Sequence, residues 1–95
     1  CIERYKYEYH ANGKIKNEIE IRNGLKHGVS REFFENGNLG SEQHWEHGKL
    51  NGKFIDYYST NSISREGTYK ENKRYGEWIY YNQDSTIVRF NYMIR

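Results

Sequence analysis

Apolar and polar residues alternate in short segments of this chain, and turn-forming residues separate the segments. A two-residue alternation is typical of a β-strand with one buried and one solvated face. The pattern predicts strands of about six to eight residues, or roughly 20–26 Å. They cover 15–21, 29–34, 39–45, 53–58, 63–69 and 77–81, and Val88, Phe90 and Tyr92 continue the alternation into a last strand.

The same residue types return every 24 residues along the chain. This step relates Gly28, Gly52 and Gly76, then Glu18, Glu42 and Glu66, and also Tyr9, Phe33 and Tyr57. It divides one domain, 1–95, into units at 5–28, 29–52 and 53–76, followed by a truncated unit at 77–95. A unit of this length is a supersecondary element that stacks on its neighbours.

Each unit contains two turn signals. Asn12-Gly13 and its repeat mates predict a type I′ turn, which needs positive φ at both central residues. The second signal is a five-residue element at 24–28, 48–52 and 72–76, expected to join one hairpin to the next. In the fourth unit the Asn-Gly turn is lost at 83–85, and aligning its tyrosine pair with that of the third unit needs a one-residue deletion.

The composition and charge of the chain narrow the possible fold classes and partners. With 10 Tyr, 4 Phe and 2 Trp but no Pro and one Ala, the chain favours pleated, half-buried strands, so the predicted class is all-β. The net charge is only +2 and both signs alternate, so the basic footprint of a nucleic-acid partner is missing. No run of about 18 apolar residues occurs, so no membrane-spanning helix is expected.

The order of motifs within each unit resembles the MORN repeat, in its longer bacterial variant. Glycine, an aromatic residue two positions on, an aromatic pair, Asn-Gly and glutamate follow one another, most plainly at Gly52, Phe54, Tyr57 and Tyr58 and at Gly76, Trp78, Tyr80 and Tyr81. The first unit departs from the pattern, with Lys6 in place of the first aromatic residue. The resemblance implies an elongated, twisted antiparallel sheet of stacked hairpins that acts as an interaction module. Some eukaryotic members are tied to membranes or dimerisation, and bacterial relatives often carry an antitoxin-like label.

Stacked repeats place equivalent side chains in rows across the sheet. Glu18, Glu42 and Glu66 form one such row, and Arg31 and Arg65 on the intervening strands are expected to separate the like charges. Because the glutamate recurs in every repeat, its position is expected to be structural rather than catalytic. No enzyme activity and no cofactor are therefore expected. His44 and His47 point to opposite sides of a strand, so no metal site is expected.

The aromatic residues of the C-terminal half are the candidate binding surface. Such patches are typical of protein interfaces, and they also stack sugars. The alternative is that the rings only pack on one another. The predicted surface consists of Tyr57, Tyr58, Tyr75, Trp78, Tyr80 and Tyr81.

The expected function is a non-catalytic protein-interaction or scaffolding module. The alternatives are a carbohydrate-binding aromatic sheet and a surface-anchored bacterial lipoprotein, because Cys1 stands where a lipoprotein carries its lipid. That anchor would be the only membrane contact and would place the protein in the cell envelope; otherwise a cytoplasmic location is expected. A homodimer could form by pairing of edge strands.

Overall fold

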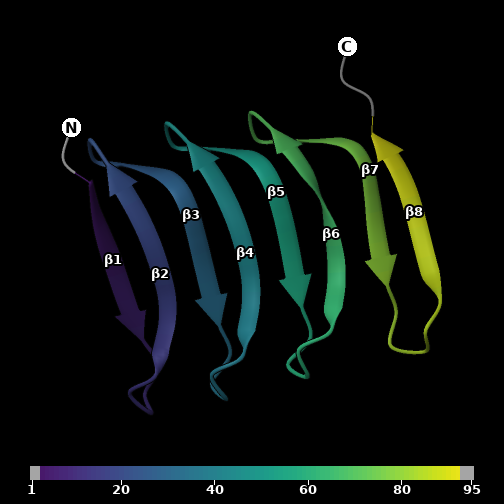
Figure 1. The fold of residues 1–95 in the computed structure, drawn as a ribbon, viewed down its shortest axis with the longest axis horizontal. Helices are drawn as coiled ribbons and strands as arrows, with labels where there is room; N and C mark the ends of the chain where they lie inside the picture. Colours follow the sequence, from purple (N-terminus) through teal and green to yellow (C-terminus); the bar gives the residue numbers. More distant parts are fainter. Residues whose placement is uncertain (1–2, 93–95) are drawn as a thin grey trace.

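The structure, a computed structural model, describes residues 3–92, and these form eight strands in one open antiparallel sheet. The strands follow the order of the sequence (Figure 1), so strands that are consecutive in the chain are also adjacent in the sheet. The all-β prediction is confirmed. The strands are β1 (Glu3–Tyr9), β2 (Ile15–Arg22), β3 (Leu25–Phe33), β4 (Leu39–Glu46), β5 (Lys49–Tyr57), β6 (Ile63–Lys70), β7 (Lys73–Tyr81) and β8 (Ile87–Tyr92).

The sheet is one layer, and the molecule measures 40 × 38 × 13 Å. Successive side chains point to opposite sides of a strand, so each face has its own set of residues. We call the side with Trp45 and Trp78 the tryptophan face, and the side with Glu18, Glu42 and Glu66 the glutamate face. Within residues 3–92 no second layer covers either face, which leaves both available for contact.

The tight turns lie at one end of the sheet, between β2 and β3, β4 and β5, and β6 and β7. Asn23 and Gly24 have φ values of 53° and 77°, and Arg22 pairs with Leu25 across them. Two central residues with positive φ make a type I′ turn. The predicted five-residue connection is therefore wrong, because the turn takes two residues and Gly28 already lies inside β3.

The Asn-Gly pairs form a wider loop at the opposite end. Only Gly13 of the first pair has positive φ, at 87°; its N–H donates to the His10 carbonyl, and the His10 N–H donates to the Lys14 carbonyl. This is a type I turn followed by one left-handed residue, the usual three-residue hairpin loop. The predicted type I′ turn is wrong at this place, because three residues, not two, lie between the hydrogen-bonded pair His10 and Lys14.

The fourth hairpin keeps the same loop without an Asn-Gly pair. Ser85 has φ 75°, as Asn61 has φ 77° at the equivalent point, 24 residues earlier. The predicted deletion before the loop is wrong. The missing residue lies in β8, which pairs with β7 without the irregularity that β5 and β6 show beside Asp56.

The best-packed region lies on the tryptophan face of β5–β8. Trp78 has 0% exposure, Phe54 has 8%, and their ring centroids are 5.6 Å apart. The indole N–H of Trp78 donates to the Thr68 carbonyl at 3.0 Å. The indole also lies directly over Gly67, where no side chain would fit, because an added Cβ would meet the ring. Aromatic packing between neighbouring hairpins thus provides the core of a one-layer protein.

Candidate functional site

The six aromatic residues of the predicted surface do not lie together. Trp78 and Tyr80 belong to the tryptophan face, whereas the alternation of β5 and β7 places Tyr57, Tyr75 and Tyr81 on the glutamate face. Tyr58, the sixth, stands at the start of the loop between β5 and β6. The grouping of these six residues in one candidate binding surface is corrected, because a strand alternates its side chains between two faces.

The exposure of the six residues also differs. Tyr75 is 43% exposed, and Lys70 Nζ lies 5.3 Å from its ring. Trp78 is completely buried, so its inclusion as an exposed residue is wrong. Its ring packs against Phe54, Tyr69 and Tyr92, which makes it part of the core.

Strand β8 supplies exposed apolar side chains that the predicted surface did not include. Val88 and Phe90 are 41% and 50% exposed on the tryptophan face, and Phe90 contacts Tyr80 edge-on at 5.6 Å. We call Tyr80, Val88 and Phe90 the β8 patch. The alternation of Val88, Phe90 and Tyr92 in the sequence indicated a strand. It did not indicate which of these side chains would be exposed.

A polar group borders the β8 patch. Arg74 donates to the Tyr92 hydroxyl at 3.0 Å, and its guanidinium lies 5.1 Å from the Trp78 ring. The hydrogen bond from Arg74 lowers the pKa of Tyr92, whereas burial raises the pKa of Tyr80. The patch therefore combines apolar rings with a fixed cation and phenol hydroxyls at its edge, a composition typical of interfaces.

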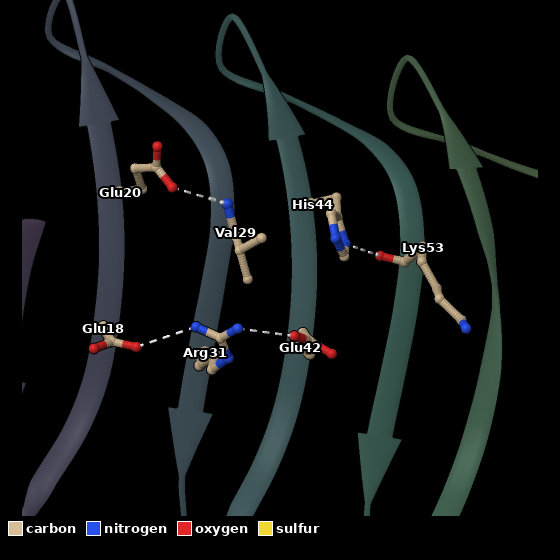
Figure 2. A network of polar contacts seen from close by, with 7 residues as sticks. All are labelled: Glu18, Glu20, Val29, Arg31, Glu42, His44 and Lys53. Carbon is tan, nitrogen blue, oxygen red and sulfur yellow. Dashed lines mark hydrogen bonds and ion pairs between the residues drawn. The ribbon is translucent and has the colours of Figure 1, made fainter. Parts of the chain in front are cut away.

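Two glutamates of the row, Glu18 and Glu42, share one arginine as their ion-pair partner (Figure 2). Arg31 lies between Glu18 and Glu42, with N–O distances of 3.3 and 3.2 Å. The expected charge alternation is confirmed for Arg31. It is wrong for Arg65, which pairs with Asp56 at 2.6 Å on the tryptophan face, while Glu66 accepts a hydrogen bond from the Tyr81 hydroxyl.

His44 and His47 have separate partners and do not contact each other. His44 Nδ1 lies 2.9 Å from the Lys53 carbonyl (Figure 2), at the point where Glu20 Oε1 accepts from the Val29 N–H one repeat earlier. The His47 ring lies 5.1 Å from that of His27. Between residues 3 and 92 no group of three or more His, Cys, Asp or Glu could hold a metal ion.

Two hollows in the surface bear on binding. One has a volume of 260 Å³ on the tryptophan face of β1–β4, and polar residues make up most of its lining around the buried Ser30. The other has a volume of 640 Å³ and lies between the loops of the third and fourth hairpins. The second hollow brings together Tyr58 and Tyr81 of the predicted surface, because the Tyr58 hydroxyl donates to the Tyr81 carbonyl at 2.6 Å.

Comparison with known proteins gives one positive result. A family model described as the MORN repeat variant matches residues 6–23, 26–49 and 50–71. No curated protein and no solved structure matches the chain. No helix in the described part of the chain is long and apolar enough to cross a membrane, and the candidate lipidation residue Cys1 lies outside the described residues.

Proposed function

Because this chain belongs to the MORN repeat variant family, whose repeats are generally associated with protein- and membrane-binding modules, we propose that it is a non-catalytic module that binds a protein partner. The family is typically non-catalytic. The glutamates that recur in each repeat have structural partners here, namely Arg31 for Glu18 and Glu42, and Tyr81 for Glu66. These contacts support a structural role for the row.

The β8 patch is the observation that carries the proposal. Val88 and Phe90 expose about half of their apolar side chains on one face, next to Tyr80 and the Arg74–Tyr92 pair. Exposed aromatic residues next to arginine are enriched in the cores of protein interfaces, where they supply most of the binding energy. A partner that covers this patch would remove Val88 and Phe90 from water.

Affinity capture tests this proposal: the purified protein serves as bait in a lysate of the cells that naturally produce it. The wild type is compared with a Val88→Ser/Phe90→Ser variant and with a matched control, Tyr5→Ser/Tyr7→Ser. The control removes side chains of similar exposure, 56% and 43%, at the other end of the sheet. We expect a partner that the wild type and the control recover and the patch variant loses. Equal recovery of every partner by all three proteins would contradict the proposal.

Lipidation at Cys1 is a separate proposal that concerns location rather than the binding surface. A lipid there would hold the module at a membrane and leave the sheet free for its partner. Intact-mass measurement of the native protein tests it: an added diacylglycerol mass supports the anchor. An unmodified N-terminus, or a residue upstream of Cys1, would exclude it.

A further inference from the structure

Asparagine side chains close the gaps between the loops of the first three hairpins. Asn12 Nδ2 donates to the Glu35 carbonyl at 2.9 Å, and Asn36 Nδ2 donates to the Ser59 carbonyl at 3.1 Å. Asn38 donates to the same Ser59 carbonyl at 2.8 Å. Each loop is therefore tied to the next by amide groups long enough to span the distance between neighbouring hairpins.

The third loop lacks these amides. One repeat after Asn36 and Asn38, the chain has Thr60 and Ser62, whose hydroxyls end closer to the backbone than an amide does. Both residues line the 640 Å³ hollow that opens between the third and fourth loops. The hollow thus lies where two amide side chains of the second loop are replaced by shorter hydroxyl side chains in the third. Its volume is in the range of small-molecule sites in proteins, about 300–1,000 Å³.

The lining of this loop hollow contains no charged side chain. It consists of hydroxyl and amide residues, two tyrosines and one isoleucine, and the hydroxyl and amide residues include Thr60, Ser62, Asn82 and Gln83. Asp84, within the fourth loop, is not part of the lining, and its carboxylate accepts hydrogen bonds from Thr86. A charged ligand would find no counter-ion here, whereas a neutral ligand with many hydroxyls would find donors and acceptors.

The two tyrosines provide fixed rings rather than free hydroxyls. The Tyr58 hydroxyl donates to the Tyr81 carbonyl at 2.6 Å, and the Tyr81 hydroxyl donates to Glu66 Oε2 at 2.5 Å. With both hydroxyls engaged, the rings are held in place and offer mainly their carbon surface to the hollow. Aromatic carbon beside uncharged hydrogen-bonding groups fits a ligand that has both C–H faces and hydroxyls.

We propose that this loop hollow binds a neutral mono- or disaccharide. The sugar's C–H face would pack on the rings of Tyr58 and Tyr81, and its hydroxyls would exchange hydrogen bonds with the side chains of Thr60, Ser62 and Gln83. The site is separate from the β8 patch, which lies on the tryptophan face and contains none of the lining residues. Failure of one proposal therefore leaves the other standing.

Chemical-shift titration of the ¹⁵N-labelled full chain tests the site. The probes are glucose, galactose, mannose, N-acetylglucosamine, cellobiose and maltose, with glucuronate and glucose 6-phosphate as charged comparisons. We expect at least one neutral sugar to shift the amides of loops 58–62 and 82–86 saturably, with no tighter binding of a charged sugar. No saturable shift with any neutral sugar, or tighter binding of a charged one, would overturn the proposal.

Two variants make the test specific. Thr60→Asn/Ser62→Asn restores the amides of the earlier loops, which should donate to the Gln83 carbonyl and close the hollow. We expect this variant to fold and to lose sugar binding by about tenfold or more, because the restored amides would fill the space that the sugar needs. Tyr5→Ser/Tyr7→Ser changes two exposed side chains at the other end of the sheet, outside the lining of the hollow, so its affinity should stay within about twofold of the wild type. Wild-type affinity in the closed variant would place the sugar elsewhere and reject this site.

Discussion

Ser30 departs from the repeat pattern, and this single side chain affects the packing of a whole region of the sheet. It stands where Phe54 and Trp78 stand in the next two repeats, and it faces Ile19 and Gln43 on the neighbouring strands. Without a large ring at this point, the tryptophan face of β1–β4 is left with the polar hollow. Ser30 is only 4% exposed, and its hydroxyl has no hydrogen-bond partner among residues 3–92.

The unpartnered hydroxyl predicts an unusual result for Ser30→Ala. A buried polar group without a partner costs about 1–3 kcal/mol, so removing it should raise the free energy of unfolding by about 1 kcal/mol. Ser41→Ala is the matched control, because Ser41 is equally buried but its hydroxyl accepts a hydrogen bond from Gln43 at 3.1 Å. That variant should be less stable than the wild type. Urea unfolding measures both, and a loss of stability in Ser30→Ala would contradict the prediction.

Tyr81 gives a prediction for alkaline pH. Its hydrogen bond to Glu66, and secondly its burial, raise the pKa of Tyr81 above the ordinary 10.0. The folded state therefore holds this proton more tightly than the unfolded state, so the contribution is fully present below pH 10.0 and is lost as the pH rises toward the raised folded pKa. The stability difference between the wild type and Tyr81→Phe should shrink over that range in urea unfolding. A difference that grows with pH would have the wrong sign.

At the scale of elements, the contact between β6 and β7 depends on a residue without a side chain. A Cβ at Gly67 would lie 2.2 Å from Trp78 Cδ2, in a region where the indole has no room to move. Gly67 does not have positive φ, so the requirement for glycine comes from the ring above it. Trp78 can pack flat on the sheet only because the neighbouring strand leaves this space.

Gly67→Ala should therefore be destabilising for a purely steric reason. Overpacking a core costs about 1–3 kcal/mol, and we expect a value at the upper end because the clash involves a rigid, buried ring. Gly40→Ala is the control: its Cβ would meet the Phe34 ring at 3.2 Å, at a site where the ring is less enclosed and can move. Thermal unfolding should show a much smaller loss for the control, and equal losses would argue against the steric explanation.

The turns show how far the sequence determines these elements. The 24-residue step located the loops of the first three hairpins but misplaced the deletion in the fourth, although similar positive φ values recur at Gly13, Gly37, Asn61 and Ser85. It did not give the turn type, since an Asn-Gly pair suits both a type I′ turn and the end of a three-residue loop. In the loop, asparagine serves through its side-chain amide, which donates to the next loop.

The candidate surface could be predicted only in part, for a related reason. The sequence shows which residues are aromatic, but the alternation along each strand divides them between two faces. The exposure of each ring then depends on which other rings pack against it. Trp78 is buried by Phe54, Tyr69 and Tyr92 from three other strands, a set of contacts that residue type alone does not reveal. The loop hollow depends on Thr60 and Ser62, which depart from the repeat, and such departures are the signal that could have located it.

On the scale of the whole molecule, each strand pairs only with its sequence neighbours, so stability should be distributed along the sheet rather than centred in one core. The distribution is uneven: the tryptophan face is aromatic over β5–β8, whereas over β1–β4 it contains a polar hollow. We therefore expect native-state hydrogen exchange to show the slowest amides in β5–β7 and the fastest strand amides in β1 and β2. Phe54→Leu, which trims the aromatic cluster, should speed exchange in β5–β8 and leave β1 and β2 nearly unchanged. A uniform increase across all eight strands would mean that the sheet opens as one cooperative unit, and the nearest-neighbour description of this protein would then be incorrect.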